Sequence, residues 1–173
     1  MPSTKRLVVH PPSESVVAAV AATHYAVKVM GRKPVALFGD PFEDRVLLDG
    51  NSPPHRLDIR GCLALAGFGR TKTSAAHLDV SYSGTEREKL PLLIDELVRY
   101  VGKKSTFVVA GLPAGRAGKS LREELLNAVR EELEKHGIEL KEEHISWHGQ
   151  WPNSVVVDPR KRQMHVFYSE ADF

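Results

Sequence analysis

The chain has 173 residues, of which 42% are hydrophobic and 27% charged, as is typical of one soluble globular domain. The net charge is only +2 and the basic residues do not cluster on one predicted face, which argues against nucleic acid as a partner. The single cysteine, Cys62, excludes an internal disulfide, no secretory segment follows Met1, and no apolar run has the length of a membrane span. We therefore expect a cytoplasmic protein, with a secreted effector that lacks a classical signal as the alternative.

Hydrophobic periodicity and turn residues predict short elements in the first third of the chain. We expect a strand over 5–10, a helix over 14–30, strands over 34–38 and 45–48, and a loop over 50–54. The helix is expected to bury a stripe of apolar residues at helical spacing, namely Val16, Val20, Val27 and Met30.

Residues 59–77 read as a β-hairpin, because two apolar runs flank Gly69-Arg70. Glycine at the first central position suits a two-residue type II′ turn. In that register Cys62 faces His77, and facing side chains have Cβ atoms about 4.5–5.5 Å apart. The thiol would then lie within reach of the imidazole, which is the minimum for a cysteine nucleophile with a histidine base.

The second half of the chain alternates helices and strands. A helix is expected over 86–101, where Thr85 and Glu88 resemble a capping box but Pro91 favours a later start. A better-defined helix runs from the capping box of Ser120 to Gly137. Strands are expected over 106–110, 138–147, 155–157 and 164–168. The pattern as a whole predicts an α/β layered sandwich with a mixed, largely antiparallel β-sheet and about three helices.

The residues alone leave two interpretations of the hairpin open. A cysteine outside a disulfide usually packs as a small hydrophobe, and a histidine on an apolar strand is usually a core residue. The predicted face shared by Cys62 and His77 also carries small residues, Ala64, Ala66, Thr73 and Ala75. These leave room either for a substrate side chain or for a closely packed helix.

Gly61-Cys62 on one strand, followed by Ala76-His77-Leu78 on the next, resembles the cysteine–histidine glutamine deamidases. This group includes the chemoreceptor glutamine deamidases and the catalytic domain of the cytotoxic necrotizing factor toxins. Toxin members carry Leu-Ser-Gly-Cys, which corresponds here to Ile59-Arg60-Gly61-Cys62. The resemblance covers about residues 55–168, so that 1–54 would be an N-terminal extension of a single domain spanning 1–173.

The resemblance implies a reaction without metal or cofactor on a protein that presents a surface glutamine. Cys62 would attack the side-chain amide carbon, and backbone N–H groups, for example that of Cys62, would hold the oxyanion. His77 would protonate the departing ammonia and then activate water to hydrolyse the thioester to glutamate.

The sequence departs from the deamidase pattern at one position. Many members of the group carry a threonine six residues before the cysteine as the third catalytic residue, and that position is Arg56 here. An arginine accepts no hydrogen bond, so we consider Asp58 as the group that orients His77. If no third group exists, the alternative function is an inactive binding or scaffold domain of the same fold.

A weaker alternative is nucleotide binding by a degenerate P-loop over 111–120, with 155–158 as an imitation of a Walker B strand. Pro113 stands where the motif has its first glycine, and proline offers no N–H to a phosphate. Three histidines also suggest a metal site, but their spacing does not suit the strands and loops predicted in this part of the chain. We expect them to be separate surface or turn residues: His144, His148 and His165.

Overall fold

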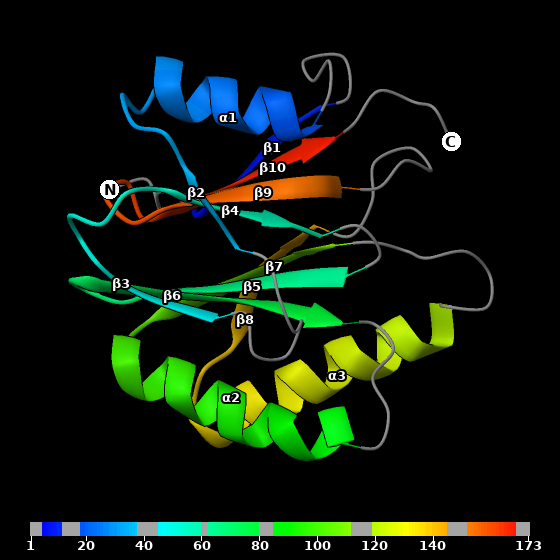
Figure 1. Ribbon diagram of the computed structural model, residues 1–173. Helices are drawn as coiled ribbons and strands as arrows, with labels where there is room; N and C mark the ends of the chain where they lie inside the picture. Colours follow the sequence, from blue (N-terminus) through cyan, green and yellow to red (C-terminus); the bar gives the residue numbers. More distant parts are fainter. Residues whose placement is uncertain are drawn as a thin grey trace.

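The computed structural model describes residues 5–11, 18–37, 45–59, 62–79, 85–111, 119–144 and 152–168. Two five-stranded sheets pack face to face, one helix covers the outer face of the first sheet, and two helices cover the outer face of the second (Figure 1). The predicted α/β layered sandwich is confirmed, but the strands form two sheets where one was expected. None of the helices in the described ranges is long and apolar enough to cross a membrane.

The elements have the following order in space. Sheet A contains β1 (Leu7–His10), β10 (Gln163–Tyr168), β9 (Pro152–Asp158), β4 (His55–Asp58) and β2 (Val35–Leu37). Sheet B contains β3 (Arg45–Asp49), β6 (Lys72–Asp79), β5 (Cys62–Phe68), β7 (Thr106–Gly111) and β8 (Leu140–His144). The helices are α1 (Ala18–Lys28), α2 (Thr85–Val101) and α3 (Lys119–Lys135). Parallel pairs join β1 to β10, β2 to β4 and β7 to β8, and the other neighbours are antiparallel.

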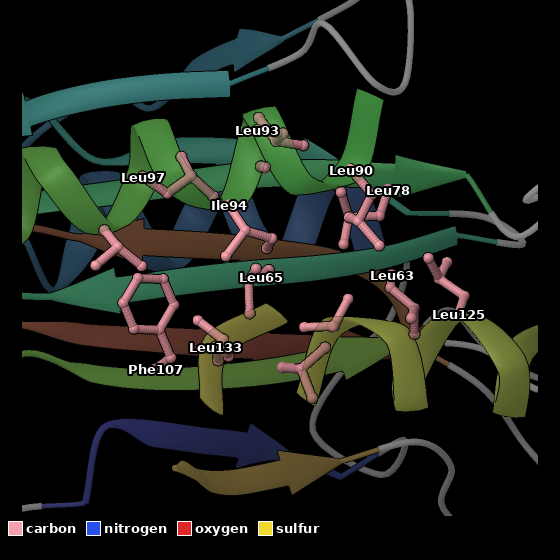
Figure 2. Close-up of a cluster of buried hydrophobic side chains, with 14 of the residues drawn as sticks. Leu63, Leu65, Leu78, Leu90, Leu93, Ile94, Leu97, Phe107, Leu125 and Leu133 are labelled. Carbon is pink, nitrogen blue, oxygen red and sulfur yellow. The ribbon is translucent and has the colours of Figure 1, made fainter. Parts of the chain in front are cut away.

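Strand β5 is covered on both faces of sheet B, which explains its nearly continuous apolar run. Its odd-numbered side chains, Leu63 and Leu65, face α2 and α3 and join the cluster of apolar side chains shown in Figure 2. Its even-numbered side chains, Ala64 and Ala66, face sheet A and join a second cluster between the sheets. A strand covered on both sides shows little alternation, because neither face meets water.

Helix α1 packs on sheet A through alanines, so the predicted burial of Val20 and Val27 is wrong. Ala22 and Ala26 are fully buried, whereas Val20 and Val27 are 64% and 51% exposed. The buried alanines cluster with Val156 of β9 and with β10. Of the other residues of the predicted stripe, Met30 packs against the same cluster and Val16 lies outside the described residues. Alanines four residues apart let the helix axis approach the sheet closely, so the larger valines are turned to its flanks.

Helix α2 begins at Thr85, so the later start expected near Pro91 is wrong. Pro91 lies inside the helix at an exposed position. There water can bond to the carbonyl group that loses its helical donor. The side chains that would form the two predicted capping boxes, those of Thr85 and Ser120, lie outside the described side chains.

Helix α3 ends as predicted at Gly137, which has a positive φ of 73°. The N–H of Gly137 donates to the carbonyl of Glu134, and that of Ile138 donates to the carbonyl of Leu133. Ile138 also packs in the same apolar cluster as Leu133. These are the two bonds and the apolar contact of a Schellman motif, in which glycine tolerates the left-handed conformation.

Gly67 of β5 faces Phe107 of β7, and a Cβ added at Gly67 would overlap the Phe107 ring. We predict that Gly67→Ala lowers the free energy of unfolding by about 1–3 kcal/mol, because the buried ring must move. In a Phe107→Leu background the same change should cost less, which a double-mutant cycle by urea denaturation would measure. Strictly additive effects would show that the ring does not constrain this position.

Candidate functional site

The hairpin of β5 and β6 has a different register from the predicted one. Cys62 faces Asp79 and His77 faces Ala64, so the predicted facing pair of Cys62 and His77 is wrong. The N–H of Gly69 donates to the carbonyl of Lys72 at 2.8 Å, which leaves the two residues between them as the turn. Each residue of β5 therefore faces a residue of β6 that lies two positions later in the chain than predicted.

Gly69 does not act as the turn residue that the sequence suggested. Among the described glycines, those with positive φ are Gly31, Gly102 and Gly137, so the expected type II′ turn centred on Gly69 is wrong. A Cβ at Gly69 would overlap the carbonyl group of Val101 at the end of α2. Glycine is needed here because a helix end approaches the strand, not because the turn needs a left-handed residue.

Cys62 and His77 nevertheless lie on the same face of sheet B. Residues two apart on a strand share a face, so Cys62 points to the same side as Ala64 and its partner His77. Such diagonal neighbours have Cβ atoms up to about 7–8 Å apart, still within reach of an imidazole ring. This face looks into the space between the two sheets, where Cys62 packs against the apolar cluster and both side chains are half-buried.

The pair lies at the end of sheet B where β5 begins and β6, β7 and β8 finish. At this end Gly111 of β7 passes close to β5, and a Cβ at Gly111 would lie 2.7 Å from the carbonyl oxygen of Cys62. The N–H of Cys62 donates to the carbonyl of Ile59 at 2.8 Å. The Cys62 amide is thus engaged within the protein, and the expectation that it holds an oxyanion is wrong for this conformation.

A row of four paired residues crosses the inner face of sheet B beside Cys62. It runs from His77 through Ala64 and Ala110 to His144. The two alanines are fully buried in the cluster between the sheets. The side chains of Ala64 and Ala110 therefore lie between the imidazoles of His77 and His144. The sequence alone did not predict this row, because it depends on three strand pairings.

His144 is half-buried and hydrogen-bonds through Nε2 to the hydroxyl of Tyr168 from sheet A, so the prediction of a surface residue is wrong. Burial lowers the pKa of His144 and raises the pKa of Tyr168. Both groups are therefore neutral near pH 7, and this bond links the two sheets near the candidate site. His148 lies outside the described residues.

His165 is also buried, contrary to the prediction. Its side chain is on the α1 side of sheet A, 2% exposed, with Nδ1 3.0 Å from Nε2 of His10. Burial, and secondarily the nearby His10 and Lys161, lower the pKa of His165 to about 3. In the described part of the chain, no group of three or more His, Cys, Asp or Glu side chains is arranged to hold a metal ion.

Asp58 lies on the other side of sheet A from His77. Its neighbours Leu57 and Ile59 belong to the cluster between the sheets, so Asp58 points outward. Its carboxylate pairs with Arg56 at 3.6 Å, and Arg56 donates to Thr23 of α1 at 2.8 Å. The predicted role of Asp58 in orienting His77 is therefore wrong.

The position that holds threonine in many deamidases has a structural role here. Arg56 joins β4 to α1 through Thr23, and Asp58 is its partner on the same strand. The strand itself, β4, was missed by the sequence analysis, because its four residues follow a proline-rich loop and alternate histidine, arginine and aspartate with a single leucine.

The predicted Walker B strand does not lie in the same sheet as the strand that precedes the predicted P-loop. Strand β7 lies in sheet B, whereas β9, which ends at Asp158, lies in sheet A. Asp158 pairs with Arg32 at 3.4 Å and accepts a hydrogen bond from the backbone N–H of Arg160 at 3.0 Å. It thus stabilises a turn and is not a Walker B aspartate beside β7. The loop over 112–118 lies outside the described residues.

Comparison with known proteins found no family model that matches the chain and no curated protein similar to it. The likeness to the glutamine deamidases therefore depends on the residues named above.

Proposed function

We propose that the protein is a cysteine hydrolase that converts glutamine side chains of another protein to glutamate, with Cys62 as nucleophile and His77 as general acid–base. The observation that supports it is the common face of Cys62 and His77 at the end of sheet B, as diagonal neighbours. A cysteine with a histidine on the same face and within reach is the minimum that a cysteine nucleophile with a histidine base requires.

The reaction has two stages. The Cys62 thiolate forms a bond to the amide carbon of the substrate, His77 delivers a proton to the nitrogen, and ammonia leaves to give a thioester. His77 then takes a proton from water, whose oxygen attacks the thioester carbon, and the carbon–sulfur bond breaks to release glutamate and regenerate the thiolate. Because the Cys62 N–H is bonded to Ile59, the mechanism requires a different donor for the oxyanion.

A second function is favoured by the places of Arg56, which departs from the deamidase pattern, and of Asp58, its expected substitute. Arg56 bonds to Thr23 of α1 and pairs with Asp58, and both side chains lie on the side of sheet A that faces away from His77. A domain that keeps the fold but uses it for binding would show this arrangement. The alternative is therefore an inactive binding or scaffold domain.

Thiol chemistry separates the two functions, because Cys62 is the single cysteine in the chain. We expect iodoacetamide at neutral pH to alkylate Cys62 in the folded protein and to abolish ammonia release from casein, used as a glutamine-containing substrate. Cys62→Ser should release no ammonia while unfolding at the same temperature as the wild type. Resistance of Cys62 to iodoacetamide in the folded protein, together with no ammonia release, would favour the binding domain.

A further inference from the structure

We infer that the pocket between α1 and the end of β1 binds a small aromatic carboxylate. The pocket has a volume of about 380 Å³, within the range of ligand sites. It lies on the outer face of sheet A, which α1 covers (Figure 1), whereas Cys62 packs in the cluster between the sheets. The inference is therefore independent of the proposed hydrolase.

One wall of this pocket is aromatic. The His10 ring stacks parallel to the Phe167 ring, with 4.5 Å between centroids and 1° between planes. The Tyr25 ring of α1 is tilted against His10 at a centroid distance of 4.9 Å. Flat rings prefer such offset or tilted neighbours, which add to the free energy gained by burying apolar area. The wall thus favours a planar ring over an aliphatic group of the same size.

The charged side chains that line the pocket are basic. Lys28, the last residue of α1, and His24, one turn earlier, flank it, and none of the described residues that line it carries a carboxylate. Burial and, secondarily, the Asp158 carboxylate raise the pKa of Tyr25, and Asp158 is itself paired with Arg32. A negatively charged ligand would therefore lie near an ammonium group and two imidazoles, and no carboxylate among the described lining residues would repel it.

The aromatic wall is fixed in place before any ligand binds. Nε2 of His10 is hydrogen-bonded to Nδ1 of His165 at 3.0 Å, and His165 is 2% exposed. This bond holds the His10 ring parallel to Phe167 from behind. A site whose rings are already ordered loses little conformational entropy on binding, which favours even a small ligand.

Benzoate is the probe that tests the inference, with benzamide and cyclohexanecarboxylate as matched compounds that lack the charge or the flat ring. We expect benzoate to shift NMR resonances of α1 and β10 with a dissociation constant of about 1–10 mM, and both matched compounds to bind more weakly. Absence of saturable shifts with benzoate up to about 50 mM would overturn the inference. Equal affinity for benzamide would overturn the anionic class, and equal affinity for cyclohexanecarboxylate the aromatic one.

Two pairs of variants locate the binding. Val29 and Val27 are both 51% exposed, but only Val29 lines this pocket. Val29→Trp should therefore fill the pocket and weaken benzoate binding at least tenfold, whereas Val27→Trp should not.

The second pair tests the charge. Lys28→Gln should weaken benzoate binding about threefold, as expected for an exposed ion pair, whereas Lys33→Gln, at an exposed position that does not line the pocket, should not. Equal effects within either pair would place benzoate elsewhere and overturn the inference.

Discussion

Replacing His77 by glutamine is expected to lower the rate of ammonia release about 10²–10⁴-fold, the contribution of a positioned general acid–base. Glutamine keeps a polar side chain of similar reach but does not exchange a proton near neutral pH. The rate of ammonia release from casein, followed as a function of pH, measures the effect. Alkylation of Cys62 by iodoacetamide should slow in the same variant, because the imidazole would no longer favour the thiolate.

His144 provides the matched control. It lies on the same face and in the same row of paired residues as His77, at the far end of the row. His144→Gln retains a group that can bond to the Tyr168 hydroxyl, so ammonia release and the pH profile should be nearly unchanged. If His144→Gln slowed the reaction as much as His77→Gln, or neither slowed it, the assignment of His77 as acid–base would be wrong.

Lowering the pH from 6.5 to 3 is expected to remove about 3–5 kcal/mol from the free energy of unfolding through His165 alone. In the folded protein His165 stays neutral down to a pKa of about 3, whereas the unfolded chain protonates it near its ordinary pKa of 6.5. Between these values the unfolded state binds one more proton. Stability that is fully present above pH 6.5 is therefore lost progressively as the pH falls toward 3.

Urea denaturation at a series of pH values would measure this dependence. Carboxylates also titrate in this range, so the difference between the wild type and His165→Phe isolates the histidine. The variant keeps a flat ring, and its stability should fall less steeply between pH 6.5 and 3. His24→Gln, at an exposed position on α1, serves as the control. Parallel curves for the wild type and His165→Phe would show that His165 is not the source of the acid sensitivity.

Local pattern was enough to predict most of the elements. The strands β5, β7 and β10 and the helices α2 and α3 occur where hydrophobic periodicity places them. The end of α3 was also predictable, because Gly137 closes the helix by bonds to its own last turn. These features depend on interactions between residues within a few positions of one another, so they can be predicted from the sequence alone.

The register of the hairpin could not be predicted in the same way. Gly69-Arg70 matched a known turn, but Gly69 is small because Val101 of α2 lies against it, and the turn falls one residue later. A contact between residues far apart in the chain thus outweighed a local turn preference. The same limit applies to α1, where alanines contact sheet A and Val20 and Val27 are exposed.

By itself, the sequence determined the class of fold, the position of most helices and strands, and the presence of a cysteine and a histidine on adjacent strands. Only the tertiary structure decided that there are two sheets, that Cys62 and His77 are diagonal neighbours, and that Asp58 faces α1 instead of His77. The reason is physical. Periodicity tells which residues of one element share a face, but the neighbours of that face are set by packing between elements distant in the chain.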